Sequence, residues 1–259
     1  VNEEFAPLAE ELTGIRIPPE KIYGQCTGKQ PANSVMVCYG GDGTLLEGVH
    51  RLCGAPIPVM GINAGHLGFL TSAPSAGLNL IFKEIAEGRL TTEARSMIEV
   101  TGDYAEQPDT TLALNEFTVQ RHGAGMISVE TYVDRQMVAT YHGDGVIVST
   151  PTGSTAYSLS AGGPVVAPTC QCLVISPLAP HNLTMRPVVI PDTGVITLNV
   201  DARRADAFVT LDNRTYPVSH GASFTVERAE QTIFLAVPHN ISFYDTLRNK
   251  MMWGIDIRS

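Results

Sequence analysis

Residues 35–44 read Val-Met-Val-Cys-Tyr-Gly-Gly-Asp-Gly-Thr, and this stretch decides the fold. The apolar run at its start is typical of a buried strand, and the three glycines allow a sharp turn whose bare N–H groups can face an anion. Thr44 is expected to be the N-cap of a helix, because apolar side chains recur with helical spacing over residues 45–52. A strand, a glycine turn and a helix in this order predict an α/β loop that binds phosphate.

Asp42, the carboxylate inside this turn, is the unusual residue. A negative charge among phosphates is repulsive unless it binds a metal, accepts a proton or hydrogen-bonds a sugar hydroxyl, so we expect a chemical role for it. No lysine follows as in a Walker loop, and the glycine spacing is not that of the dinucleotide fingerprint. A plain strand-to-helix turn with an aspartate cap is the alternative.

The whole chain has 259 residues and a net charge of -9, with room for two domains. It has no basic run, which argues against nucleic acid or an anionic membrane as partner, and no apolar stretch long enough to span a bilayer. The first residues are not those of a signal peptide, and because the chain starts at Val1 we expect residues to be missing ahead of it.

Five cysteines without a Cys-x-x-Cys pair fit free thiols in a reducing cytoplasm. Seven histidines are scattered without a metal-binding pattern, so no dedicated metal site is predicted.

The first 92 residues alternate helical and strand patterns. Helical spacing over 5–12 precedes the strand of the opening motif, a second strand pattern covers 57–62, and a glycine-rich turn over 63–70 leads to a helical pattern over 78–86. Such alternation indicates a Rossmann-like α/β domain with a parallel sheet, in which ligands lie beyond the carboxyl ends of the strands. Both glycine turns are at such ends.

From about residue 93 the apolar residues alternate with a period of two, as over 127–133. Many short strands separated by Gly, Pro and Asp predict an all-β sandwich domain over 93–240. The segment 241–259 returns to helical spacing over 243–252 and is predicted to pack back on the first domain. The other predicted strands are 115–120, 145–149, 195–200, 208–211, 224–227 and 233–237.

A second conspicuous segment, residues 142–164, runs from a strand into a turn rich in hydroxyl groups. Seven Ser or Thr residues between 149 and 160 can recognise ribose and base edges, and Tyr157 offers a stacking face. A Ser/Thr-rich capping loop is the alternative reading of this segment by itself.

Taken together, the two segments closely resemble the NAD kinase family, and specifically its bacterial members. The Gly-Gly-Asp-Gly element is shared with lipid kinases and 6-phosphofructokinases, whereas the stretch Thr-Pro-Thr-Gly-Ser-Thr-Ala-Tyr-Ser is highly specific. The resemblance runs from residue 35 to the end of the chain. The motifs that carry it are Gly40–Thr44, Gly61–Leu70, Asn115-Glu116, Gly143–Gly145 and Thr150–Ser158.

The resemblance implies ATP-dependent phosphorylation of the 2′-hydroxyl of the adenosine ribose of NAD, giving NADP. It also implies an α/β domain whose first strand lies before Val1, a β-sandwich domain, and substrate between the two. A neighbouring subunit would complete the site, so a cytoplasmic homodimer or homotetramer is expected. Because no residue is a clear metal ligand beyond Asp42, a divalent ion, Mg²⁺, is expected to arrive with ATP.

The resemblance also implies the roles of individual residues. Asp42 matches the catalytic aspartate, which would take the proton of the attacking hydroxyl. Asn115 and Glu116 match a pair that contacts nucleoside hydroxyls, and a polar pair at the start of a strand is the alternative. The other residues implied in substrate binding are Gly41, Gly43, Phe69, His142, Asp144, Thr155, Ala156, Tyr157, Ser158, Ser160 and Ala179.

For two of these residues a structural role is the alternative to substrate binding, and a third would act only across a subunit interface. Asp144 lies between glycines and could belong to a structural turn, Phe69 could be a core residue, and Ala179 would act by its backbone across a subunit interface. The chain departs from the family at Asp212-Asn213-Arg214, where Asp-Gly-Gln is common, so no role is carried over to Arg214.

Two other functions remain open from the sequence. A diacylglycerol or sphingosine type lipid kinase would share the Gly-Gly-Asp-Gly element but not the hydroxyl-rich stretch. A non-catalytic NAD-binding sensor would share both, although an intact Asp42 argues against it.

Overall fold

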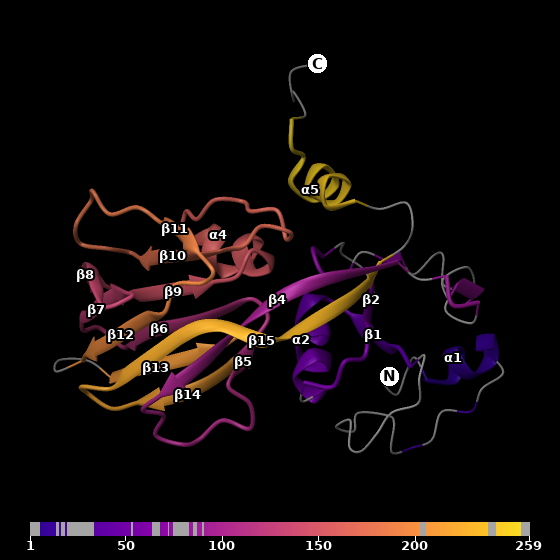
Figure 1. Cartoon of the computed structure of the whole chain (residues 1–259), viewed down its shortest axis with the longest axis horizontal. Helices are drawn as coiled ribbons and strands as arrows, with labels where there is room; N and C mark the ends of the chain where they lie inside the picture. The colour runs from indigo at the N-terminus through magenta and orange to yellow at the C-terminus, as the bar shows by residue number, and fades with distance from the viewer. Residues whose placement is uncertain are drawn as a thin grey trace. The chain divides into compact units, whose positions relative to one another are not determined.

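The computed structural model describes residues 6–13, 16, 19, 34–52, 54–63, 68–71, 73–74, 83–84, 87–89, 91–202, 206–237 and 242–254. The chain divides into two compact units (Figure 1). Unit 1 comprises Val1–Ala94 with Ile233–Ser259, and unit 2 comprises Arg95–Thr232. The predicted domain boundaries, after residues 92 and 240, stay predictions, and each unit is described by itself.

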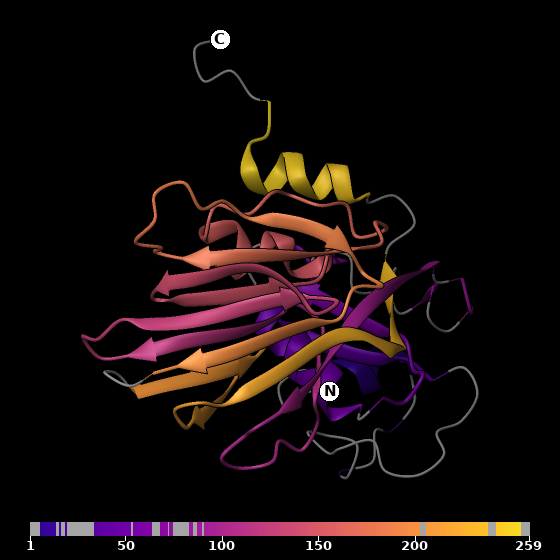
Figure 2. The ribbon, with the colours of Figure 1, turned by 60° about the vertical axis from the view of Figure 1, so that its left-hand side comes forward.

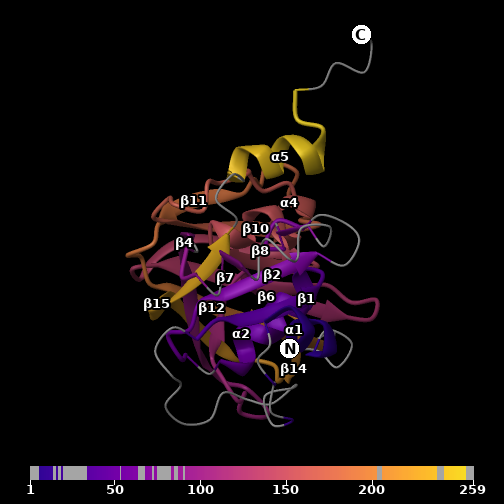
Figure 3. The ribbon, with the colours of Figure 1, turned by 90° about the vertical axis from the view of Figure 1, so that its right-hand side faces the viewer.

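Unit 1 contains a parallel sheet. Strand β1 (Met36–Gly40) pairs in parallel with β2 (Val59–Asn63), and β2 pairs in parallel with the short β3 (Ala73–Pro74). Figure 3 shows β1 and β2 side by side. Helix α2 (Asp42–Arg51) connects them and buries Leu45, Leu46 and Val49, so the predicted α/β fold of this region is confirmed.

Two more helices belong to unit 1. Helix α1 covers Ala6–Thr13 and overlaps the helical pattern predicted over 5–12, and α5 covers Phe243–Met251. Ser242 caps α5 by accepting from the Asp245 amide while the Asp245 side chain accepts from the Ser242 amide, which is a capping box. The predicted helix over 78–86 lies mostly outside the described residues.

The start of α2 corrects one prediction. The helix begins at Asp42 with Gly41 as N-cap, and Thr44 is already inside the first turn, donating its amide to the Gly41 carbonyl at 3.0 Å. Gly40 has φ +156°, which lets the chain leave β1 and enter the helix at once. The earlier start places the Asp42 carboxylate in the first helical turn, where the helix dipole favours negative charge.

Unit 2 is a sandwich of two sheets whose strands pair mostly antiparallel, as predicted (Figure 2). One sheet contains β4 (Thr91–Gly102), β5 (Leu112–Ala113), β7 (Ile127–Val133), β8 (Gln136–Gly143), β12 (Ile196–Asp201) and β15 (Ser223–Val237). The other has the order β11 (Val188–Pro191), β10 (Cys172–Leu178), β9 (Gly145–Ser149), β6 (Glu116–His122), β13 (Asp206–Leu211) and β14 (Arg214–Val218).

Apolar side chains from both sheets form one core. Alternate residues of β7 and β12 are buried, which is the period of two that the sequence shows. Phe117 on β6 stacks against Phe224 on β15 at 5.3 Å between ring centroids, joining the two layers. The fully buried members include Ile98, Val119, Ile127, Val129, Val148, Leu198 and Val209.

The strand predictions differ from the structure in two ways. The predicted strands 224–227 and 233–237 are one strand, β15, because the polar residues between them extend along its exposed face. Strands β4, β8, β10, β11 and β14, and the two-residue strands β3 and β5, are not among the predicted ones. Of these, β11 and β14 are edge strands with little burial, so their sequences lack the apolar alternation on which the prediction depends.

The hydroxyl-rich segment follows β9 as a 3-10 helix, Thr152–Thr155, and one short helix, α4 (Tyr157–Ser160). None of the helices in the described part of the chain has the length and apolar character needed to cross a membrane.

Candidate functional site

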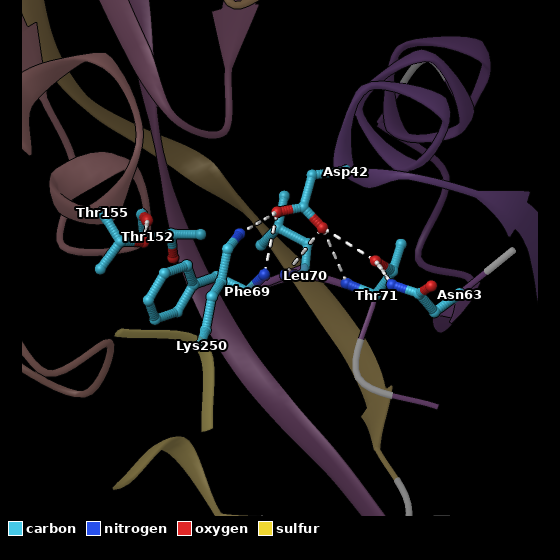
Figure 4. Close-up of polar contacts among 8 residues, drawn as sticks. All are labelled: Asp42, Asn63, Phe69, Leu70, Thr71, Thr152, Thr155 and Lys250. Carbon is cyan, nitrogen blue, oxygen red and sulfur yellow. Dashed lines mark hydrogen bonds and ion pairs between the residues drawn. The ribbon is translucent and has the colours of Figure 1, made fainter. Parts of the chain in front are cut away.

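The Asp42 carboxylate is held by a single short segment, residues 69–71 (Figure 4). Its Oδ2 accepts from the Phe69 amide at 2.9 Å, and its Oδ1 accepts from the amides of Leu70 at 3.1 Å and Thr71 at 3.0 Å. The Thr71 hydroxyl also donates to Oδ1 at 3.0 Å and receives the Asn63 side-chain amide at 3.4 Å. The carboxylate therefore has one fixed orientation.

The two oxygens of Asp42 are not equivalent. A carboxylate oxygen has two lone pairs in its plane, and Oδ1 already faces three donors. Among the described residues, Oδ2 accepts one hydrogen bond, from Phe69, and the side chain is 29% exposed. The oxygen that can take a further proton or hydroxyl is therefore Oδ2.

Gly68 makes this arrangement possible. A Cβ added there would overlap the Asp42 carboxylate and the Thr71 hydroxyl. Gly41 and Gly43 behave differently, because a Cβ at either would meet nothing within 4 Å. The space in front of Gly41 and Gly43 is open to a ligand, whereas the space at Gly68 is filled by the carboxylate itself.

Lys250 of α5 places a cation beside this carboxylate. Its Nζ lies 3.9 Å from Asp42 Oδ2 and 4.6 Å from the centroid of the Phe69 ring (Figure 4). Phe69 also lies 6.5 Å from the ring of Phe243 in the same helix, and it is half-buried. Sequence reasoning missed Lys250, since nothing in a short amphipathic helix shows which residue it faces.

In unit 2, the backbone of residues 114–116 is held at both its N–H and C=O groups. Asp212 accepts from the amides of Leu114 at 2.9 Å, Asn115 at 2.7 Å and Glu116 at 3.2 Å. Thr150 donates its hydroxyl to the Leu114 carbonyl at 2.6 Å and its amide to the Asn115 carbonyl at 2.9 Å. The backbone of this segment is therefore fixed by hydrogen bonds from Asp212 and Thr150.

The side chains carried by this segment have unused acceptors. Asn115 Oδ1 and Glu116 Oε2 are buried and have no hydrogen-bond partner among the described residues. The Glu116 carboxyl accepts from the backbone amide of Tyr157, and burial, with the nearby charge of Asp212, raises its pKa to about 8. Two buried oxygens on consecutive residues call for hydrogen-bond partners, because a buried polar atom left unpaired is costly.

The hydroxyl-rich segment lies against the same residues. Gly153 packs so closely that an added Cβ would overlap the Asn115 backbone. The Tyr157 ring is 39% exposed, and its hydroxyl donates to Gln120 Oε1 at 3.3 Å. Thr155 is half-buried, with its hydroxyl 3.4 Å from the Thr152 carbonyl (Figure 4).

The predicted residues of α4 differ in accessibility. Ser158 is fully buried, and its hydroxyl pairs with that of Ser176 at 2.9 Å, so this hydroxyl is occupied within unit 2. Ser160 is exposed, and Ala156 is the half-buried N-cap residue of the helix.

His142, Asp144 and Ala179 form a second group in unit 2. The Asp144 amide donates to the Leu178 carbonyl at 2.9 Å, and Gly143 packs against the carbonyl of Ala179, whose φ is +39°. The Arg121 side chain donates to Asp144 Oδ1 at 2.6 Å, and this hydrogen bond raises the pKa of Arg121.

His142 Nδ1 pairs with the Ser128 hydroxyl at 2.7 Å. Strand β6 links the two groups of unit 2, because it carries Glu116 at one end and Gln120 and Arg121 further on.

The structure thus gathers the predicted residues into one cluster in unit 1 and two adjoining clusters in unit 2. Residues that sequence reasoning missed are Lys250, Thr71, Gln120 and Arg121, while Asp212 was noted only as a departure from the family. In the described part of the chain no three His, Cys, Asp or Glu side chains come together in a way that could hold a metal ion.

Comparisons with known proteins show the family of this chain. The model of the ATP-NAD kinase N-terminal domain matches residues 25–90, and that of the ATP-NAD kinase C-terminal domain matches residues 114–237. An NAD kinase of Porphyromonas gingivalis is 41% identical over 224 residues, 86% of this chain and 77% of the relative. An NAD kinase of Christiangramia forsetii is 40% identical, over 100% of this chain and 89% of the relative.

Solved structures show the same similarity. A crystal structure of an NAD kinase from Archaeoglobus fulgidus in complex with ATP has a TM-score of 0.78 at 27% identity, covering 97% of this chain and 96% of that one. Yeast NADH kinase complexed with NADH, at 23% identity, has a TM-score of 0.78 over 87% of this chain and 68% of that one and supports the fold. From the two family models and the relatives together, this chain belongs to the NAD kinase family.

Proposed function

We propose that this chain transfers the γ-phosphoryl group of ATP to the 2′-hydroxyl of the adenosine ribose of NAD, giving NADP. Its membership of the NAD kinase family supports the reaction. The observation that carries the chemistry is the Asp42 carboxylate, fixed by three consecutive amides with Oδ2 open to one more partner.

Asp42 is the general base of this proposal. A hydroxyl that attacks a phosphoryl group must be oriented and must lose its proton, and a carboxylate oxygen within hydrogen-bond distance does both. The amides of residues 69–71 fix the orientation of the carboxylate before substrate arrives, so little reorganisation is needed during the reaction.

Lys250 reduces the electrostatic penalty of this arrangement. Phosphate groups near Asp42 would repel its charge. The Lys250 ammonium, 3.9 Å from Asp42 Oδ2, attracts both the carboxylate and the phosphate groups. The turn contains no Walker lysine, so Lys250 is the cation that we assign to the phosphoryl donor. The open backbone at Gly41 and Gly43 leaves room for the donor's oxygens.

The nucleoside of NAD has the donors that unit 2 lacks. The two hydroxyls of a ribose diol, each of which can donate and accept, can satisfy Asn115 Oδ1 and Glu116 Oε2, two of the buried polar atoms that have no hydrogen-bond partner in the described part of the chain. The exposed face of Tyr157 can stack on a base, and Thr155 and Ser160 offer further hydroxyls. We keep His142, Asp144 and Ala179 as further binding residues, with Phe69 beside the reacting groups.

A divalent ion, Mg²⁺, is proposed to arrive with ATP. When bound it would neutralise charge on the phosphates, and since no cluster of metal-ligating side chains occurs in the described ranges, phosphate and water would supply most of its ligands.

We also propose a cytoplasmic homodimer or homotetramer. Exposed apolar side chains on and near the edge strand β11 support association: Leu183 is 84% exposed and Val189 is 50% exposed. Light scattering after size-exclusion chromatography would measure the mass of the oligomer. If the wild type is oligomeric and Val189→Lys is monomeric, the contact includes strand β11.

The direct test is incubation of the protein with NAD, ATP and Mg²⁺, followed by detection of NADP with an NADP-specific dehydrogenase. NADP formation that disappears in Asp42→Asn supports the proposal. Phosphorylation of diacylglycerol or a sphingoid base in place of NAD would favour the lipid kinase, which the family models do not favour. NAD binding without any NADP would favour the sensor.

A further inference from the structure

The hairpin turn between β13 and β14 has a role that reaches into the site. It consists of Asp212 and Asn213, and Asp212 has φ +52°, a left-handed conformation that Asp and Asn tolerate better than most residues. Its carboxylate points toward the backbone of residues 114–116 and accepts their three amides, and burial raises its pKa while these amides and Arg214 oppose the increase. The Asp212 side chain therefore faces the protein interior, although the residue lies in a hairpin turn.

The carboxylate completes the backbone hydrogen bonding of residues 114–116. Its two oxygens accept the three amides of this segment, and the Asp212 amide donates to the Glu116 carbonyl at 2.9 Å. With the two bonds from Thr150, every backbone N–H and C=O of the segment has a partner. Four of the six bonds come from Asp212.

Arg214 extends the same contact toward the preceding residues. Its guanidinium donates to the carbonyls of Thr110 at 3.0 Å and Leu112 at 2.6 Å. Asp212 of the turn and Arg214, the first residue of β14, therefore hold the segment 110–116, Asp212 by accepting its amides and Arg214 by donating to two of its carbonyls.

We propose that Asp212 is a positioning residue for NAD, with Arg214 as its partner. It sets the directions in which Asn115 Oδ1 and Glu116 Oε2 face the ribose hydroxyls, and it does not touch the substrate. The inference rests on the proposed function, because it takes these two acceptors as the nucleoside contacts.

Asp212→Asn tests this role. Asparagine keeps the size and the left-handed turn, but it offers one acceptor oxygen and turns an NH₂ donor toward amides that are donors themselves. The KM for NAD should rise by about 10- to 100-fold, the range of one or two charge-assisted hydrogen bonds. The KM for ATP should change by less than about threefold, because misdirected acceptors act on one substrate only.

Asp134→Asn is the matched control. Asp134 is the first residue of the two-residue turn between β7 and β8 and has φ +50°; its carboxylate accepts from the Val195 amide at 3.0 Å, and its own amide donates to the Val195 carbonyl at 2.9 Å. The same substitution at the first residue of another two-residue hairpin turn should lower the melting temperature without changing either KM.

The outcomes separate the positioning role from the proposed function. If Asn115→Ala raises the KM for NAD and Asp212→Asn leaves it within about twofold of wild type, the positioning role is wrong and the nucleoside site stands. If neither variant changes it while NADP is still formed, the assignment of the nucleoside contacts is wrong. If Asp212→Asn does not fold, Arg214→Lys decides: it keeps the charge, loses the paired contact with two carbonyls, and should raise the KM for NAD alone.

Discussion

Asp42 in unit 1 and Asp212 in unit 2 make the same set of backbone contacts. Each carboxylate accepts three consecutive amides, those of residues 69–71 and of residues 114–116. Their surroundings differ: Asp42 is 29% exposed beside the ammonium of Lys250, whereas burial raises the pKa of Asp212.

The difference teaches that counting hydrogen bonds does not assign a role. At Asp42 the amides fix the orientation of the carboxylate, whose Oδ2 remains open to a substrate. At Asp212 the carboxylate fixes the backbone of residues 114–116, and Asn115 and Glu116 of this segment carry the buried side-chain oxygens without partners.

The sharpest way to break this comparison is Asp42→Asn. If Asp42 is the general base, turnover should fall by about 10²–10⁴-fold while NAD still binds. The measurement is the rate of NADP formation, with NAD affinity determined by calorimetry. Asp103→Asn is a control, because Asp103 is an exposed carboxylate that accepts only the Ser223 amide at 2.9 Å among the contacts described. Near-normal turnover of Asp42→Asn would refute the role.

Gly68→Ala displaces the carboxylate without changing its chemistry. The added methyl group overlaps Asp42 and Thr71, so Oδ2 must move, and we expect turnover to fall by about 10²-fold, the cost of a misplacement near 1 Å.

The control for Gly68→Ala is Gly48→Ala, which adds the same methyl against the buried thiol of Cys38, away from the carboxylate. It should lower the melting temperature and keep turnover. Equal loss of turnover in both variants would mean that Gly68 acts through stability alone.

Lys250→Met removes the cation that lies beside the Asp42 carboxylate. We expect kcat/KM for ATP to fall about fivefold, since the attraction of one partly exposed charge is worth about 1 kcal/mol. The rate should be measured at several salt concentrations, because the remaining attraction is screened. Arg248→Met on the same helix is the control, as Arg248 pairs with Asp245. An unchanged kcat/KM for ATP would remove Lys250 from the site.

Glu116→Gln tests the unit 2 side of the comparison through the pH dependence of stability. Because the pKa of Glu116 is raised from 4.5 to about 8, the folded protein keeps a proton that the unfolded chain has released between these values. The free energy of unfolding of the wild type should therefore fall as the pH rises from 4.5 to 8.

Glutamine does not titrate, so the melting temperature of Glu116→Gln minus that of the wild type should increase over this interval and level off above it. Glu130→Gln, at an exposed carboxylate, is the control. A difference that stays constant with pH would show that Glu116 is ionised throughout.

Much of the fold was accessible from the sequence for a physical reason. The strand, turn and helix of residues 35–52 and the alternation over 127–133 bury one face of each element, and burial is what leaves a periodic pattern. Strand β11 has no buried face of its own, so its pattern carried no signal. Thr44 was misplaced as a cap because the φ of Gly40, and not a capping side chain, decides where α2 begins.

The site divides in the same way. Asp42 was predicted because a charge among glycines is conspicuous within a few residues of sequence. Lys250 and Asp212 act on residues far from them in the chain, and their meaning depends on contacts that only the fold creates.

Gly68 and Gly153 give this molecule an unusual mutational profile. At each position an added methyl group would overlap a polar group of the candidate site: the carboxylate of Asp42 for Gly68, and the backbone of Asn115 for Gly153. A scan that shortens side chains to alanine would pass over both as already minimal. In this chain, glycine-to-alanine substitutions at these two positions therefore report on the Asp42 and Asn115 sites more sensitively than the usual truncation of side chains to alanine.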